Sequence, residues 1–386
     1  MILIKNGKVI TMNNITYNRG CVLIEGNKIV RVDEHIDETE DMEVIDANGG
    51  WVIPGIIESH CHIGLCEEGI RFEGDDINEA TKPITGHLRA IDAINPLDEA
   101  FKDAIASGVT SVMTGQGSAN VCGGKFVFMK TSGKCIDDMI VKKEAAMKVA
   151  LGENPKRVYS SKQISPSTRM ATAAILREAL MDALNYKNKK ELASKKGEYF
   201  DIDLKKECFI DVLNKKIPLK AHAHRADDIL TAIRIAKEFD LDMTLDHCTE
   251  GHLIQEYIKK SGFSAIVGPS LTSRSKVELK NRTFKTASIL NQAGIEVAIT
   301  TDHPVIPIQY LPICAGFAAK EGLGVEEGLK AITINAARIC KVDDRLGSIE
   351  VGKDADIAIF TGNPMEVFTQ TLYTIIDGKI VYYKNN

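Results

Sequence analysis

The chain has 386 residues, of which 44% are hydrophobic and 26% are charged. A chain of this length buries more apolar surface than one core usually holds, so we expect one large domain and one smaller domain. With 48 Lys and Arg against 53 Asp and Glu, the net charge is −5, which leaves no basic field for nucleic acid or an anionic membrane.

Short strands and turns are predicted for residues 1–53, where Asn-Gly and Gly-Asn pairs separate β-rich segments. The same style returns near the other end of the chain, in residues 345–386. These two segments resemble each other more than either resembles the middle of the chain. We therefore expect residues 1–53 and 345–386 to form one composite β-sandwich domain.

The middle of the chain, residues 54–344, alternates short apolar strands with amphipathic helices. Segment 226–239 repeats apolar residues at i, i+3, i+4 and i+7, the spacing of one helix face, and segments 172–186 and 325–340 are similar. Strands are expected at residues 108–114, 217–222, 242–247, 264–269 and 296–302. Strands that alternate with helices over this length predict an α/β domain with a parallel sheet, open or closed.

Residues of the kinds that bind metals stand at the ends of four of the expected strands. In strand order they are His60 and His62, which follow an expected strand at residues 51–57, then His222 and His224, His247, and Asp302. Two histidines that are two positions apart share one face of an extended strand. In a (β/α)8 barrel the functional residues lie at the C-terminal ends of the strands, so such side chains converge. Neutral imidazoles with a carboxylate suit Zn²⁺ first, and also Mn²⁺, Fe²⁺ or Ni²⁺.

Four motifs make the chain similar to a known family. VIPGIIESHCH, residues 52–62, resembles the first barrel strand of the amidohydrolase superfamily, and TTDHP, residues 300–304, resembles its eighth. IKNGKVI near the start and GSIEVGKDADI near the end resemble its terminal β segments. The resemblance covers the whole chain and points to the imidazolonepropionase-like branch, which includes dipeptidases. It implies a (β/α)8 barrel over residues 54–344.

The resemblance also implies which residues hold the metal. The family takes its ligands from barrel strands 1, 5, 6 and 8, which here are His60, His62, His222, His247 and Asp302. The histidine of strand 5 is ambiguous, because His224 shares a face with His222. Relatives use the first histidine of such a stretch, so we assign His222 to the metal and His224 to the substrate. One or two divalent ions are expected.

Members of this family that hold two ions add a bridging ligand, either a carbamylated lysine or a glutamate. The stretch of residues 146–154 offers Lys148 and Glu153 for this role. A lysine serves only where it is desolvated enough to react with CO₂ and become an anion. An ordinary surface lysine on a helix is the commoner case, so both candidates stay open.

Two arginines are candidate contacts for the substrate. Arg274 follows the expected seventh barrel strand, and it either binds a substrate carboxylate or forms a surface salt bridge. Arg225 stands three positions after His222, where similar deaminases and imidazolonepropionases carry a glutamate that moves protons. This departure argues against a purine or pyrimidine deaminase and weakens the case for imidazolonepropionase itself.

The implied activity is hydrolysis of C–N bonds in amides, cyclic amides or dipeptides. The metal lowers the pKa of bound water and polarises the carbonyl, Asp302 carries the proton to the leaving nitrogen, and His247 stabilises the developing oxyanion. The alternative is deaminase or imidazolonepropionase activity on a small nitrogen heterocycle. A non-catalytic scaffold usually loses ligands, whereas here the set is intact. A Rossmann dehydrogenase needs a Gly-x-Gly-x-x-Gly turn, which is absent from this sequence. The glycine-rich residues 115–124 do not match a phosphate-binding pattern, and we interpret them as an ordinary turn.

The remaining features concern location and partners. No apolar run reaches the roughly 20 residues of a membrane helix, and the first residues do not have the pattern of a signal peptide. The nine cysteines are scattered without a Cys-x-x-Cys pair, which indicates reduced thiols and a cytoplasmic location. Cys61 and Cys248 are interpreted as packing residues. We expect a homo-oligomer that acts on a small molecule and binds neither nucleic acid nor membrane.

Overall fold

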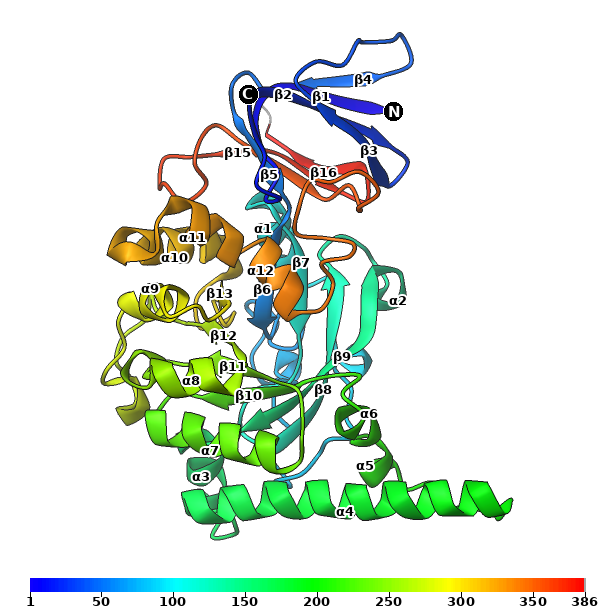
Figure 1. The fold of residues 1–386 in the computed structure, drawn as a ribbon, viewed down its shortest axis with the longest axis vertical. Helices are drawn as coiled ribbons and strands as arrows, with labels where there is room; N and C mark the ends of the chain where they lie inside the picture. Colours follow the sequence, from blue (N-terminus) through cyan, green and yellow to red (C-terminus); the bar gives the residue numbers. More distant parts are fainter. Residues whose placement is uncertain (385–386) are drawn as a thin grey trace.

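The computed structural model describes residues 1–384 as two eight-stranded β-sheets, one of them surrounded by helices. One sheet curves into a barrel in the middle of the molecule, and the other lies at one end of it together with both chain termini (Figure 1). The predicted fold class is confirmed, because a nearly closed barrel stands beside a separate sheet formed by the two chain ends.

The barrel sheet runs in the order β6-β7-β8-β9-β10-β11-β12-β13. Its strands are β6 (Ile56–Cys61), β7 (Val109–Thr114), β8 (Cys122–Lys130), β9 (Ile140–Ala150), β10 (Leu219–Ala223), β11 (Met243–His247), β12 (Ser264–Val267) and β13 (Val297–Ile299). The first and last strands come together at the carboxyl end, where Thr300 Oγ1 donates to the carbonyl of His60 at 2.6 Å. The amide of His62 donates to the carbonyl of His303 at 2.8 Å.

The barrel departs from a regular (β/α)8 pattern at β8. This strand pairs antiparallel with both β7 and β9, whereas the other pairs in the sheet are parallel. The reason is the length of the connections, since parallel neighbours need a crossover of about a dozen residues or more. Only residues 115–121 separate β7 from β8. The glycine-rich stretch that was interpreted as a turn therefore makes a hairpin and contributes the first residues of β8.

Helices cover the outside of the barrel. They are α1 (Glu99–Ala106), α2 (Ile136–Met139), α3 (Glu153–Ser161), α4 (Arg169–Lys196), α5 (Leu204–Glu207), α6 (Ile210–Leu213), α7 (Ala226–Glu238), α8 (Gln255–Ser261), α9 (Lys285–Gln292), α10 (Leu311–Ala318), α11 (Val325–Ala331) and α12 (Ile334–Ile339). The helix expected from the spacing of residues 226–239 is α7, which buries Ile229, Ala232 and Ala236. The single helix expected at residues 325–340 is wrong, because non-helical angles at Thr333 separate α11 from α12.

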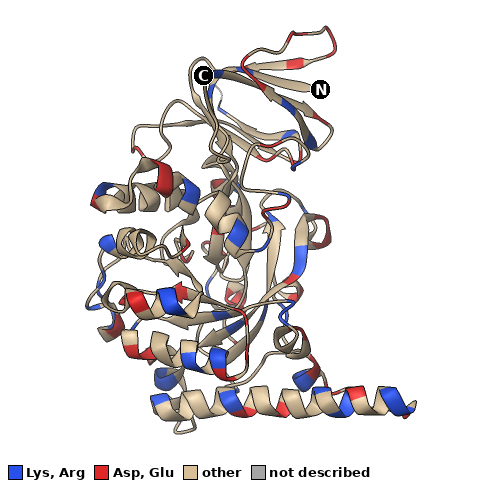
Figure 2. Ribbon diagram, in the orientation of Figure 1, with Lys and Arg blue, Asp and Glu red and all other residues tan. Residues whose placement is uncertain are grey.

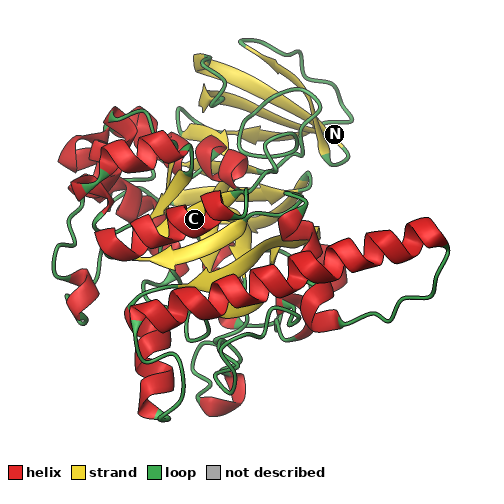
Figure 3. Ribbon diagram, turned by 60° about the horizontal axis from the view of Figure 1, so that its bottom comes forward, coloured by secondary structure: helices red, strands yellow, loops and turns green. Residues whose placement is uncertain are grey.

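The longest helix, α4, lies at the end of the barrel opposite the terminal sheet, and part of it projects past the body (Figure 1, Figure 3). It carries charged residues along its length (Figure 2) and ends at Gly197, whose φ of 67° is the left-handed conformation of a common helix stop. Within residues 1–384, no helix is both long and apolar enough to cross a membrane.

The terminal sheet joins the two ends of the chain in the order β16-β15-β14-β5-β1-β2-β3, with β4 paired to β1. Its strands are β1 (Ile2–Ile10), β2 (Thr16–Glu25), β3 (Lys28–Asp33), β4 (Glu43–Asp46), β5 (Trp51–Pro54), β14 (Ile357–Phe360), β15 (Thr371–Ile376) and β16 (Lys379–Tyr383). The junction is the antiparallel pair β5–β14. The domain boundaries at residues 53 and 345 stay a prediction.

Candidate metal centre and active site

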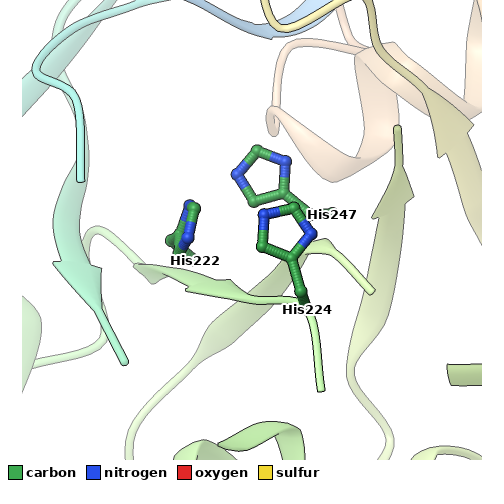
Figure 4. Close-up of side chains that lie close together, drawn as sticks. All are labelled: His222, His224 and His247. Atoms are coloured by element: carbon green, nitrogen blue, oxygen red, sulfur yellow. The ribbon is translucent and has the colours of Figure 1, made fainter. Parts of the chain in front are cut away.

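Two clusters of buried side chains that could hold a metal ion lie at the carboxyl ends of the barrel strands. One consists of His60, His62 and Asp302, and the other of His222, His224 and His247. Within each cluster the ligand atoms lie within 4.8 Å of one another. Figure 4 shows the second cluster, where the rings of His222 and His224 at the end of β10 face that of His247 at the end of β11. The structure thus brings together the side chains that the four expected strand ends carry.

The backbone is strained where two of these side chains leave their strands. His247 and Asp302 have φ angles of 72° and 55°, in the left-handed region that residues other than glycine rarely adopt. The amide of Asp302 donates to Thr300 Oγ1 at 2.9 Å, which helps to hold this turn. Strain of this kind persists where the surrounding structure fixes it, and it is often found at functional sites.

Backbone carbonyls orient two of the imidazoles. Nδ1 of His62 donates to the carbonyl of Gly115 at 2.7 Å, and Nδ1 of His247 donates to that of Gly268 at 2.8 Å. In a neutral ring the proton is then on Nδ1, so Nε2 keeps its lone pair for a ligand inside the site. Among the described residues, Nε2 of His247 and Oδ1 of Asp302 are buried and have no hydrogen-bond partner. A divalent cation would satisfy both atoms, so the donor set fits a metal.

The charge states suit a cation. Burial lowers the pKa of His60, His222 and His247 below the ordinary value and that of His224 to about 3, so these rings are neutral at pH 7. Burial alone would raise the pKa of Asp302, but His247 and the neighbouring histidines outweigh it and hold that pKa well below its usual range. The site therefore offers neutral nitrogens and one ionised carboxylate, which is a donor set that binds Zn²⁺.

A second layer of charged residues lies beneath His60, inside the barrel. Lys148 on β9 is fully buried, and its Nζ lies 3.2 Å from Nε2 of His60. On the other side of that ring, Oδ2 of Asp246 lies 3.1 Å from Nδ1. Lys220 donates to Oδ1 of Asp246 at 3.3 Å and to the carbonyl of Ser59 at 2.9 Å. Burial lowers the pKa of Lys148 to about 8 against the opposing effect of Asp246.

A cavity of about 270 Å³ opens over the two clusters. Five side chains of the two clusters line it: His62, His222, His224, His247 and Asp302. The rest of the wall combines polar groups, among them Asn154 and Lys276, with apolar ones such as Leu279 and Val305. A largely preformed cavity with a few convergent polar groups is the usual form of a small-molecule site.

Comparison with known proteins identifies the family. Residues 67–382, most of the chain, match the model of the amidohydrolase family. The chain belongs to the amidohydrolase family. It is 43% identical to a solved amidohydrolase from Thermotoga maritima MSB8, with a TM-score of 0.97 and all of both chains covered. The predicted family is confirmed, and this amidohydrolase is an enzyme that acts on carbon–nitrogen bonds.

Three other relatives are less similar to the present chain than the Thermotoga maritima protein is. The chain is 28% identical to the amidohydrolase tasK of Hapsidospora irregularis over 93% of its own length, but it spans only 39% of that protein. It is 26% identical to an imidazolonepropionase of Fusobacterium nucleatum, with 97% of this chain and 94% of the relative covered. A prolidase solved in complex with N-methylphosphonate-L-proline shares the fold, with a TM-score of 0.64 at 17% identity.

The other predicted site residues of this amidohydrolase lie in different surroundings. His224 lines the cavity, and its Nδ1 lies 2.8 Å from Thr249 Oγ1. Glu153 starts α3, where its carboxylate accepts from the amide of Glu278 at 3.4 Å. In the described part of the chain, Lys148 contacts a side chain of the two clusters, that of His60. Glu153 makes no such contact there.

The two arginines lie outside the cavity wall. Arg225 forms two hydrogen bonds to Asp227, at 2.8 and 2.9 Å. Arg274 is exposed and donates to the backbone carbonyls of Lys280 and Arg282 at 3.0 and 3.1 Å. Neither arginine is among the residues that line the cavity, so the expectation that they contact the substrate stays a prediction.

Sequence reasoning missed four residues around the site. Lys220 and Asp246 stand inside the short strands β10 and β11, and a lysine within such a strand signals a buried charge that needs a partner. Asn154 and Lys276 come from segments far apart in the chain, yet Lys276 Nζ donates to Asn154 Oδ1 at 2.8 Å. No local pattern marks either of the last two, since only the tertiary fold brings them together.

Proposed function

We propose that this amidohydrolase cleaves amide, cyclic amide or dipeptide C–N bonds with a metal-activated water and Asp302 as the general base. The observation that carries the proposal is the pair of buried, unpartnered atoms, Nε2 of His247 and Oδ1 of Asp302. They lie among neutral imidazoles beside a cavity of small-molecule size.

The proposed ligands divide between two ions. His60, His62 and Asp302 would hold one, and His222 and His247 the other, with Zn²⁺ preferred and Mn²⁺, Fe²⁺ or Ni²⁺ as alternatives. A bound metal supplies Lewis acidity, which lowers the pKa of water and polarises the scissile carbonyl.

Lys148 is the better candidate for a bridging ligand. As an ammonium ion 3.2 Å from Nε2 of His60, it would repel any cation that this nitrogen binds. Reaction of the neutral amine with CO₂ forms a carbamate, releases a proton and leaves an anion at the same place. Glu153 starts a helix and bonds to the amide of Glu278 instead. The position of Lys148 therefore supports the carbamate.

Asp302 and His247 have separate roles in this proposal. Asp302 is ionised, so one oxygen is free to accept the proton of the attacking water and to pass it to the leaving nitrogen. His247 donates its Nδ1 proton to the carbonyl of Gly268, so its Nε2 is an acceptor. This arrangement favours His247 as a metal ligand over a donor to an oxyanion. His224 is left to contact the substrate.

The second candidate is deaminase or imidazolonepropionase activity on a small nitrogen heterocycle. The similarity to an imidazolonepropionase over nearly the whole chain favours it. Arg225 stands where such enzymes carry a proton-moving glutamate, and its side chain is bound to Asp227 outside the cavity. This observation favours amide hydrolysis as the first candidate.

Metal analysis and a substrate panel test the proposal. Protein purified without added metal should carry about one or two divalent ions per chain, as the available ligands allow, and a chelator should abolish turnover. Dipeptides and cyclic amides should be hydrolysed without release of ammonia, whereas a deaminase would release it from aminopyrimidines. Protein that contains no metal and binds none on titration would refute the metalloenzyme.

A further inference from the structure

One wall of the cavity carries a charged residue that the proposed mechanism does not use. Lys276 lies in the loop that follows β12. Among the described residues, 1–384, it is the one Lys or Arg that lines the cavity. Its side chain is 27% exposed and lines the cavity, and long cationic side chains in such positions commonly pack the stem and leave the charged end to water or a ligand.

The local partners of Lys276 leave part of its hydrogen-bonding capacity unused. Nζ donates to Asn154 Oδ1 at 2.8 Å, but the nearest carboxylate oxygen, Oε1 of Glu278, lies 3.8 Å away. That distance is beyond a hydrogen bond. An ammonium group has three donors and no acceptor, so at least one N–H is available to an anionic group in the cavity.

Asn154 connects this cation to the metal-binding end of the site. Its Nδ2 donates to Ser118 Oγ at 2.7 Å and lies 3.5 Å from Nε2 of His222. Ser118 and His222 line the same cavity. Lys276 and the metal clusters are thus separated by little more than one asparagine side chain. A small ligand that reaches the metal end therefore also reaches the ammonium group.

We propose that Lys276 and Asn154 form a subsite for a carboxylate, which makes the substrate a small amide with a free carboxylate close to the scissile bond. This inference rests on the proposed function for the nature of that bond. The cavity of about 270 Å³ lies at the small end of ligand sites, and Ile77, Leu279 and Val305 add apolar surface to its wall. N-acyl amino acids, dipeptides and cyclic amide acids match this chemistry.

A binding experiment tests the subsite independently of turnover. The probes are 4-oxopentanoate and 5-hydroxypentan-2-one, which contain no amide bond to hydrolyse and differ in whether the end group is charged; both are titrated by calorimetry onto the protein as isolated. The wild type should bind the carboxylate roughly 10-fold or more tightly than the neutral alcohol, as expected for one charge-assisted hydrogen bond. Lys276→Met should lose this preference, and Lys276→Arg should retain much of it. Lys280→Met, at an exposed position outside the cavity wall, should bind like the wild type.

Three results would overturn the subsite: equal binding of the two probes by the wild type, no binding of either, or a carboxylate preference that survives in Lys276→Met. Thermal unfolding of each variant shows whether it is folded. Turnover of the dipeptide and cyclic amide panel then separates the two proposals. Carboxylate-selective binding without amide cleavage would refute the proposed function and leave the subsite standing. Amide cleavage without carboxylate-selective binding would refute the subsite and leave the proposed function standing.

Discussion

Replacement of Asp302 by asparagine separates metal binding from proton transfer. Oδ1 of Asp302 lies 3.2 Å from Nε2 of His62 and 3.5 Å from Nε2 of His60, and Oδ2 lies 3.9 Å from Nδ1 of His247. The asparagine keeps one oxygen that can reach a cation shared with these histidines, but it removes the base. Asparagine also tolerates the left-handed backbone, which at this residue has a φ of 55°.

The expected loss is that of a general base, about 10² to 10⁴ in rate. At about 1.4 kcal/mol for each factor of ten, this corresponds to roughly 3 to 5.5 kcal/mol of transition-state stabilisation. Asp302→Asn should therefore retain much of its metal and lose nearly all turnover. His60→Ala should lose metal and turnover together, because it removes a ligand without touching the base.

The assay measures kcat and, on the same preparations, metal content by elemental analysis. Asp240→Asn is the matched control, because Asp240 is also an aspartate with a positive φ, of 52°, but its side chain is exposed and pairs with Lys215. It should leave both quantities unchanged. If Asp302→Asn turned over substrate at a rate near that of the wild type, Asp302 would be a ligand alone. The base would then be sought at Glu153 or His224.

Three further predictions concern Lys148, Gly115 and Asp354. Incubation with ¹³C-bicarbonate should give a carbamate NMR signal that Lys148→Gln loses and that Lys142→Gln, on the same strand, keeps; a signal that persists in Lys148→Gln would disprove the bridging role. In Gly115→Ala the new Cβ would lie 2.2 Å from the ring of Phe126, so denaturant unfolding should reveal a loss of about 1 to 3 kcal/mol and titration a weaker metal affinity; unchanged stability and affinity would contradict this packing. Burial alone would raise the pKa of Asp354, but three surrounding cations hold that pKa below 3.8. The ionised carboxylate therefore stabilises the fold at neutral pH. This stabilisation is lost as the pH falls through the lowered pKa. Asp354→Asn should cost about 1 to 3 kcal/mol at pH 7 and progressively less in acid, and a difference that does not change with pH would refute that assignment.

Residues at strand ends were the most predictable part of the molecule. His60 and Asp302 stand 242 positions apart in the sequence, yet they meet because the barrel rule brings the carboxyl ends of its strands to one face. The rule depends only on finding the strands, and their short apolar runs were visible. The helix α7 was equally clear, because its apolar spacing matches one buried face.

The rest of the site depends on contacts that no local pattern encodes. The antiparallel direction of β8 follows from the short connection between β7 and β8. The glycines of this connection are as typical of an ordinary turn as of a hairpin that leads into a strand. The buried state of Lys148 required knowing that β9 lies inside the barrel wall. Lys276 and Asn154 are 122 positions apart in the sequence and are joined by a single hydrogen bond. In the same loop, the sequence pointed to Arg274 as the substrate contact instead of Lys276.

The pairing of β5 with β14 has a consequence for how the chain folds during its synthesis. Pro54 pairs with Ile357, so one edge of β5 lacks its partner until about 300 further residues have been made, which takes roughly 15 to 60 s at about 5 to 20 residues per second. During that interval the barrel can assemble, whereas β5 presents an open edge of the kind that pairs with other chains. The strands β1 to β5 can pair with one another early, but the free edge of β5 is protected only after the ribosome has made the chain as far as Phe360.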